Sequence, residues 1–358
     1  MNFALIPWSK NELNDGIFYE IRNDGERIPT RSAAYLMMEE FVRRGHTIHT
    51  IDLYPKLDDV DFFLFYVLDW EWIKKITNQR LEGRMVYCNA EPPSVTKLNT
   101  PEGFEILKKY FPYILTWNPE WVDECRVFHR VIPYYYDFKA CNIPFNERKL
   151  ITAISANKKS DWDGELYTER ENAYYYFEKY YPEKFDFYGV GWEGTNHPCY
   201  GGKVRDKKEV FHRYRFAICF ENTRTKKNYI TEKIWDCLNS QIVPIYAGAE
   251  LITDFIPKEC FINFYDFKNY DELSRYILEM TEEVYNEYLE AARRLLADES
   301  VISLFSGEKY AENIIDAVSH SVDFSMRWKE KIYINIYWAW IKWFGILKKF
   351  VKRIVKCK

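Results

Sequence analysis

The sequence predicts an α/β protein in which two Rossmann-like domains face each other across a cleft. Three observations support this fold class. Strand-like and helix-like segments alternate along the chain, the alternation comes in two successive series, and 358 residues are more than one hydrophobic core usually absorbs. Apolar residues make up 47% of the chain, which is enough for two cores and argues against disorder.

The first series covers residues 1–146 and predicts an N-terminal domain. Its clearest helix is at residues 32–45, where apolar residues recur at helical spacing until Gly45. The predicted strands are at residues 2–7, 46–53, 61–68, 84–91 and 113–118. Such alternation is typical of a parallel, doubly wound sheet.

The second series covers residues 147–322 and predicts a C-terminal domain of the same kind. Strands are expected at residues 150–157, 185–191, 216–222, 242–248 and 260–267. Helices are expected at residues 164–181, 207–215, 231–240 and, as one long stretch, 270–297. In open α/β sheets ligands bind beyond the carboxyl ends of the strands, so residues that follow a strand are the first candidates for a site.

The distribution of charge along the chain indicates which kinds of macromolecule the protein is expected to bind. Lys and Arg number 50 and Asp and Glu 54, yet residues 327–358 hold ten of the basic residues and a single acid, Glu330. The rest of the chain is therefore clearly acidic, which argues against nucleic-acid binding by the body of the protein. The eight cysteines form no C-x-x-C pair and residues 1–16 contain no signal-peptide core, so we expect a cytoplasmic location.

Two familiar motif types are present but carry little weight. Residues 189–194 read G-x-G-x-x-G after a strand, but turn-forming residues follow where a dinucleotide site needs a helix, so a nicotinamide cofactor is not expected. Two D-x-D triplets occur, at residues 59–61 before a strand and at residues 161–163 after one. Short acidic triplets are common by chance, and the six histidines show no metal-binding spacing. We expect no bound metal.

Glu91 lies directly beyond an apolar strand, in the Pro-stiffened turn NAEPPSV. A doubly wound domain displays its functional groups at such positions, and an immobilised carboxylate can act as a general base. An exposed loop acid would give the same pattern. Position alone leaves both interpretations open.

The densest polar region follows the strand at residues 216–222. Glu221 and Asn222 end that strand, Thr231 is placed to cap the next helix, and Glu232 and Lys233 fall in its first turn. A Glu suits the positive end of a helix dipole, whereas a Lys does not unless an anion, such as a diphosphate, also binds there. An ordinary amphipathic helix start is the alternative, and spacing alone does not exclude it.

Residues 216–267 resemble the signature of glycosyltransferase family 10, the α1,3/4-fucosyltransferases. The segments FAICFEN, NYITEK, VPIYAG and CFINFYDF occur in the family's order, and looser similarity extends over residues 85–270. The resemblance implies a two-domain fold of the B type (GT-B) and GDP-fucose as the donor. It implies no essential metal or other cofactor, because cationic side chains and helix termini can stabilise the departing diphosphate.

The resemblance also assigns roles to individual residues. Glu91 would be the base that deprotonates the acceptor hydroxyl, although Pro92 stands where the family usually has Ser. Arg170 and Lys233 would neutralise the diphosphate. The implied donor-binding set as a whole is Arg170, Lys207, Glu221, Asn222, Tyr229, Thr231, Glu232 and Lys233.

Residues 323–358 form a third segment, rich in basic and aromatic residues. The apolar stretch at 332–347 is interrupted by Asn335 and Lys342 and is short for a membrane span. We expect a basic amphipathic helix on an anionic membrane surface, with Trp338, Trp340 and Trp343 at the level of the lipid headgroups. A helix packed on the protein's own core is the alternative.

These inferences predict an inverting fucosyltransferase, cytoplasmic and peripherally attached to the membrane. It would transfer L-fucose from GDP-fucose to a hydroxyl of an N-acetylglucosamine-type residue in a surface glycan, with an α1,3 linkage favoured. One alternative is a GT-B enzyme that uses a different nucleotide sugar. Another is a non-catalytic protein that binds glycans or membranes.

Overall fold

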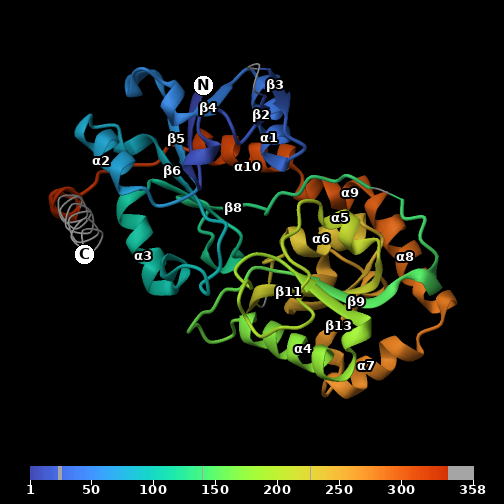
Figure 1. Ribbon diagram of the computed structural model, residues 1–358. Coiled ribbons are helices and arrows are strands. Elements are labelled where there is room, and N and C mark those ends of the chain that lie inside the picture. Colours follow the sequence, from blue (N-terminus) through green and yellow to red (C-terminus); the bar gives the residue numbers. More distant parts are fainter. Residues whose placement is uncertain (23–25, 139, 226, 338–358) are drawn as a thin grey trace, which may run out of the picture.

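The computed structural model describes residues 1–22, 26–138, 140–225 and 227–337 of the chain. Two lobes are visible in Figure 1, each built around its own sheet, with the first sheet in blue to teal and the second in green to yellow. All strands in both large sheets pair in parallel. The predicted α/β class with two Rossmann-like domains is confirmed.

The first sheet has six strands in the order β4-β1-β5-β6-β7-β8. Its strands β5, β6 and β7 are almost entirely buried, as expected where helices cover both faces of a parallel sheet. The strands are β1 (Asn2–Ile6), β4 (Thr47–Thr50), β5 (Phe62–Phe65), β6 (Met85–Cys88), β7 (Tyr113–Thr116) and β8 (Val127–His129).

Several elements of this domain escaped the sequence prediction. Each is short, so that its hydrophobic periodicity extends over too few residues to be diagnostic. Alongside the predicted α1 (Ala33–Arg43), the structure adds β8, α2 (Trp70–Asn78), α3 (Pro101–Tyr110) and a small antiparallel pair, β2 (Tyr19–Ile21) with β3 (Arg27–Pro29). Side-chain caps start both added helices, from Asp69 for α2 and from Thr100 for α3.

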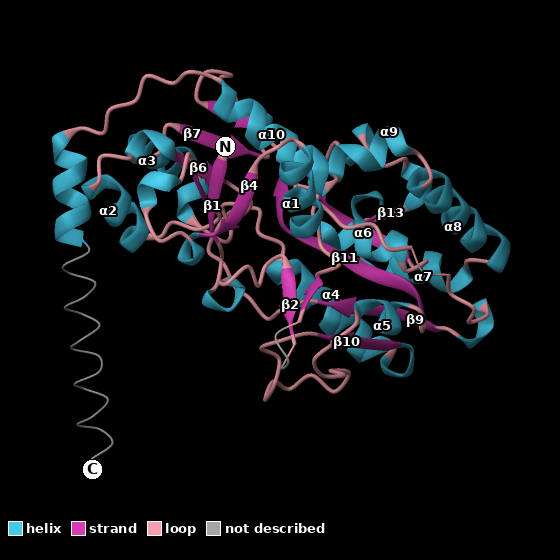
Figure 2. Ribbon diagram, turned by 90° about the horizontal axis from the view of Figure 1, so that it is seen from above, coloured by secondary structure: helices cyan, strands magenta, loops and turns pink. Residues whose placement is uncertain are grey.

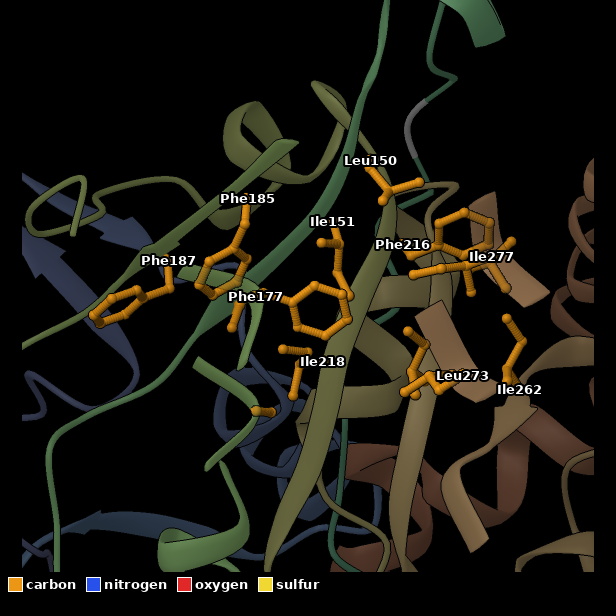
Figure 3. Close-up of a cluster of buried hydrophobic side chains, with 14 of the residues drawn as sticks. Leu150, Ile151, Phe177, Phe185, Phe187, Phe216, Ile218, Ile262, Leu273 and Ile277 are labelled. Carbon is orange, nitrogen blue, oxygen red and sulfur yellow. The ribbon is translucent and has the colours of Figure 1, made fainter. Parts of the chain in front are cut away.

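The second sheet has five strands in the order β10-β9-β11-β12-β13. The strands are β9 (Lys149–Ile154), β10 (Phe185–Tyr188), β11 (Tyr214–Thr225), β12 (Val243–Ala249) and β13 (Ile262–Asn263). The helices are α4 (Tyr167–Tyr180), α5 (Lys207–Phe211), α6 (Glu232–Asn239), α7 (Tyr270–Glu279), α8 (Glu282–Leu296) and α9 (Glu299–Ile302). Figure 3 shows part of the core on one face of this sheet, where Phe177 of α4 lies near Phe185 and Ile151.

The long helix expected at residues 270–297 is two helices. Met280 is extended between α7 and α8, with ψ 124°, and Thr281 caps α8 by accepting a hydrogen bond from the Val284 amide at 3.4 Å. The apolar period continues through the break, but the Thr cap starts a new helix in a new direction.

The predicted boundary of the second domain at residue 322 is also wrong. Helix α10 (Gly307–Ser319) lies beside the first sheet and α1 in Figure 1. Its residues Tyr310 and Ile314 belong to the first domain's core. A Cβ on Gly307 would lie 2.2 Å from the Ala33 carbonyl oxygen, so the close approach of α10 to α1 requires glycine. The chain therefore returns to the first domain at about residue 307.

The described part of the basic tail also docks on the first domain. Residues 328–337 are helical and lie beside α2 in Figures 1 and 2. Ile334 is 1% exposed within the first domain's core, and the Trp70 ring lies 5.2 Å from that of Tyr337. The expected headgroup residues, Trp338, Trp340 and Trp343, lie outside the described residues. Within the described ranges, no helix is both long and apolar enough to cross a membrane.

Candidate active site

A cavity of about 610 Å³ lies between the two domains, at the carboxyl ends of their strands. From the first domain it is lined by Trp8, Tyr66, Glu91, Arg130 and Tyr310, among others. The second domain contributes Lys158 and five residues of the predicted set, which are Asn222, Tyr229, Thr231, Glu232 and Lys233. A larger groove, of about 1,130 Å³, lies at the β13 edge of the second sheet and contains none of the predicted residues. We call the first cavity the interdomain cleft.

Hydrogen bonds hold the backbone of Glu91, whereas its side-chain carboxylate is not used in holding the loop. Its carbonyl oxygen accepts hydrogen bonds from the buried Asn99 side chain and, at 3.3 Å, from the Trp117 indole. No other described residue donates a hydrogen bond to its carboxylate. Burial raises the pKa of Glu91 above the usual carboxyl range, and Lys158 and Lys233 offset part of that rise. A fixed carboxylate of raised pKa is suited to accept a proton.

The loop that carries Glu91 is joined directly to the second domain. The Ser94 hydroxyl donates to the Asn222 carbonyl oxygen at 3.2 Å and accepts from the Thr223 hydroxyl. Trp117 packs against Tyr229, with 5.0 Å between the ring centroids. The end of β11 and the turn after β6 are therefore held in one position relative to each other.

Lys233, in the first turn of α6, is paired with a buried carboxylate, that of Glu221. Glu221, within β11, is fully buried, and its carboxylate accepts from the Thr231 amide at 2.9 Å and from the Lys233 ammonium at 3.1 Å. Thr231 caps α6 by accepting from the Lys233 amide. The Lys233 ammonium is thus held beside the positive end of the helix by an anion beneath it.

The charge states of Lys233 and Glu232 follow from the groups around them. Burial pulls the pKa of Lys233 down, but Glu221 and Glu232 outweigh it and raise the pKa above its ordinary value. For Glu232, desolvation raises the pKa, but Lys233 and Lys207 outweigh it and lower the pKa. Both groups are therefore charged at neutral pH. Lys233 and the free N–H groups of α6 make this wall of the cleft a site for an anion.

Three of the predicted donor-binding residues lie outside the interdomain cleft. Glu221 has no exposed surface, so it can act on a ligand only by holding Lys233 and Thr231. Arg170 is 4% exposed, and its guanidinium donates to the carbonyl oxygens of Phe220 and Glu221 at 2.7 and 3.0 Å. Lys207 pairs with Asp236 of α6. Arg170 and Lys207 line a small adjoining cavity, which Lys233 also lines.

Sequence reasoning missed several residues that line the cleft, among them Trp8, Tyr66, Lys158, Arg130 and Tyr310. Trp8 follows β1, Tyr66 follows β5 and Lys158 lies beyond β9, so the rule that pointed to Glu91 could also have found them. Arg130 and Tyr310 carry no such signal. They reach the cleft from the segment after β8 and from α10, and that placement depends on the tertiary structure.

The described residues contain no group of three or more His, Cys, Asp or Glu side chains placed to hold a metal. Independence from metal stays a prediction. What the cleft offers is a carboxylate of raised pKa on one domain and a cation at a helix N-terminus on the other. This arrangement can remove a proton from a nucleophile and stabilise an anionic leaving group.

In sequence, part of this chain is similar to known fucosyltransferases. Residues 147–306 match the model for the C-terminal part of glycosyltransferase family 10 (fucosyltransferase). A stretch of 78 residues is 46% identical to the α-(1,3)-fucosyltransferase FucT of Helicobacter pylori, covering 22% of this chain and 16% of that protein. A stretch of 77 residues is 36% identical to the α-(1,4)-fucosyltransferase of Arabidopsis thaliana, covering 21% and 19%. The matched stretches thus span less than a fifth of these relatives' length.

The likeness in fold extends over both domains. The crystal structure of an α1,3-fucosyltransferase with GDP superposes with a TM-score of 0.57 at 16% identity, covering 91% of this chain and 92% of that one. This confirms the predicted GT-B-like arrangement of two Rossmann-like domains. Together with the family match at residues 147–306, it confirms the resemblance to glycosyltransferase family 10, the fucosyltransferases, that was found in the sequence.

Proposed function

We propose that this protein is an inverting fucosyltransferase that transfers L-fucose from GDP-fucose to a hydroxyl of an N-acetylglucosamine-type residue in a surface glycan, with α1,3 linkage. The observation that supports it best is the placement of Glu91 on one side of the cleft and Lys233 at the α6 N-terminus on the other. The family match and the names of the relatives support fucose as the sugar.

The mechanism uses these groups in a single displacement. The Glu91 carboxylate takes the proton of the acceptor hydroxyl, and the oxygen attacks C1 of the fucose. The bond between C1 and the diphosphate oxygen breaks, and its electron pair leaves with GDP. Lys233 and the N–H groups of α6 stabilise that negative charge. Attack on the face opposite the leaving group inverts the configuration at C1.

The donor is tested with a panel of GDP- and UDP-sugars and N-acetyllactosamine as acceptor, followed by linkage analysis of the product. We expect turnover with GDP-fucose and an α1,3 product. Preference for a different nucleotide sugar would identify the rival GT-B transferase instead. No turnover with any donor, with activity assays indifferent to Lys233→Ala, would favour a non-catalytic binding protein.

We also propose that the basic tail holds the enzyme on the cytoplasmic face of an anionic membrane. Trp328, Ile332 and Ile336 are spaced four residues apart on the docked helix and are 74%, 47% and 64% exposed. They form an apolar stripe that the protein's own core leaves uncovered. Residues 338–358, which continue the chain, contain seven Lys or Arg and no acid. An apolar stripe next to a basic segment favours binding to anionic lipid.

Removing only residues 338–358 is the appropriate test, because Met326 and Ile334 belong to the first domain's core. We expect the shortened protein to stop sedimenting with phosphatidylglycerol vesicles, while its melting temperature and its turnover of soluble acceptors remain those of the full chain. Phosphatidylcholine vesicles are the control and should bind neither protein. Undiminished sedimentation of the shortened protein with anionic vesicles would reject the tail as the anchor.

A further inference from the structure

Arg130 is a buried cation on the first-domain side of the interdomain cleft. It follows β8, and its amide donates to the Thr116 carbonyl oxygen of β7 at 2.9 Å. The residue is only 3% exposed, yet it lines the cleft. Lys233 has the Glu221 carboxylate beneath it, whereas Arg130 forms no ion pair with any described carboxylate. A buried charge is unfavourable unless other groups compensate it, so the surroundings of Arg130 need an account.

The neighbours of Arg130 fix its guanidinium group but use only part of its hydrogen-bonding capacity. Nε donates to the Val131 carbonyl oxygen at 2.8 Å, and Nη1 donates to the Tyr310 hydroxyl at 3.2 Å. The Tyr310 ring covers one face of the group, with its centroid 4.2 Å from Cζ. A guanidinium carries five N–H groups, and those on Nη2 have no acceptor among the described residues. The end of the group is therefore held in place and still able to donate.

The position of Arg130 assigns it to the acceptor and not to the donor. Glu91, the proposed base, comes from the same domain, whereas Lys233 and the N–H groups of α6 are on the second domain. The Tyr310 ring that supports Arg130 lies 6.2 Å from the ring of Tyr66, which also lines the first-domain side. An acceptor that presents a hydroxyl to Glu91 lies against the side of the cleft that contains Arg130.

We propose that Arg130 binds a carboxylate of the acceptor, so that the enzyme prefers a glycan in which a uronic acid is joined to the sugar that receives fucose. This inference rests on the proposed function. Glu91 and Arg130 line one cavity of about 610 Å³, so the reacting hydroxyl and the carboxylate belong to adjoining sugars.

The chemistry of the guanidinium group favours a carboxylate over other anions. Its planar end, Nη1 and Nη2, matches the two oxygens of a carboxylate. A phosphate monoester carries a charge of about −1.5 to −2 at neutral pH, more than the single positive charge of Arg130 balances. Because the guanidinium is fixed before the ligand binds, it loses little conformational freedom on binding.

The test compares glucuronosyl-β1,4-N-acetylglucosamine with glucosyl-β1,4-N-acetylglucosamine, two acceptors that differ only at C6 of the first sugar. We expect a kcat/KM about tenfold higher for the acid in the wild type, as charged hydrogen bonds contribute. The amide of the uronic acid, which keeps the shape without the charge, should behave like the neutral acceptor.

Arg130→Met should abolish this preference while the KM for GDP-fucose stays within about twofold. Arg130→Lys should keep part of it, because the charge remains but the planar fork is lost. Arg215→Met is the matched control, since that guanidinium also lies over an aromatic ring, Phe145 at 4.3 Å, but outside the cleft. It should leave the preference for the acid unchanged.

Calorimetric titration of the GDP-loaded protein with the two disaccharides follows binding without turnover. We expect about tenfold tighter binding of the acid to the wild type and equal binding of both to Arg130→Met. Equal affinity of the wild type for the acid, its amide and the neutral disaccharide would overturn the proposal, and this result requires no variant to fold. A retained preference in Arg130→Met with a raised KM for GDP-fucose would also overturn it, since Arg130 would then serve the donor. Failure of the proposed function would show differently, as selective binding of the acid without any turnover of GDP-fucose.

Discussion

Replacing Glu91 with Gln should reduce fucosyl transfer about 10²- to 10⁴-fold, the usual contribution of a general base. The amide has the shape of the carboxylate but cannot take a proton at neutral pH. The fold around it should persist, because Asn99 and Trp117 bind the backbone carbonyl of Glu91 and not its side chain. Turnover measures the first effect, and calorimetric titration with GDP should show donor-site affinity within about twofold of wild type, since no donor contact is assigned to this carboxylate.

The pH dependence of the rate gives a second readout for Glu91. Burial raises the pKa of the carboxyl group, so the base form is lost as the pH falls through this raised value. The wild-type rate should therefore decline on the acid side with a midpoint above that of an ordinary Glu, and this limb should vanish from the residual rate of the Gln variant.

Glu12→Gln is the matched control, because Glu12 also lines the cleft and the amide oxygen can still accept the hydrogen bond from Ser9. It should leave both the rate and the acid limb in place. Near-normal turnover of the Glu91→Gln variant would remove Glu91 from the role of base.

Replacing Lys233 with Met should weaken donor binding and destabilise the second domain at the same time. Loss of a charge-assisted contact costs about 1.5–3 kcal/mol, a fall in GDP-fucose affinity of about ten- to hundredfold. The fully buried Glu221 would also lose its cation, and breaking a buried pair from one side costs about 3–5 kcal/mol. Steady-state kinetics and denaturant unfolding measure the two effects separately.

A double variant separates the two roles of Lys233. In Glu221→Gln with Lys233→Met no buried charge is left alone, so the unfolding free energy should recover while donor affinity stays low. Lys149→Met is the control, since its partly exposed pair with Asp186 should contribute no more than about 1 kcal/mol. A Lys233→Met variant as stable as wild type would contradict the buried pair, and full donor affinity would contradict the contact with the diphosphate.

The sequence predicted candidate site residues where their position is set by a single strand or helix start. Glu91 was predicted as a polar residue just beyond an apolar strand, since in parallel sheets the carboxyl ends of the strands meet at one edge. Lys233 was predicted from its place in the first turn of the helix that follows another such strand, at residues 216–222. The strand-end rule needs no knowledge of distant contacts. It applies equally to Trp8 and Tyr66, which were overlooked because a lone aromatic residue after a strand does not differ from a core residue in sequence.

The sequence did not predict which charged side chains of the site are buried and which are exposed. Glu221 and Glu232 both occur in the family signature, yet the first is fully buried and the second is half exposed. Arg170 of α4 is buried against β11, where its guanidinium donates to the backbone carbonyls of Phe220 and Glu221. Whether a charged side chain faces a ligand or a neighbouring element depends on what packs over it, and residues far along the chain decide that.

The sequence by itself determined the two α/β domains and the resemblance to glycosyltransferase family 10, and it predicted Glu91 and Lys233 as candidate site residues, because each inference depends on periodicity or on local motifs. Only the tertiary structure showed that α10 returns to the first domain and that Glu221 holds Lys233 from below. It also brought Arg130 and Tyr310 into the same cleft as Glu91. These features depend on packing and hydrogen bonds between segments that are distant in the sequence. A local sequence pattern does not show which distant segments will meet.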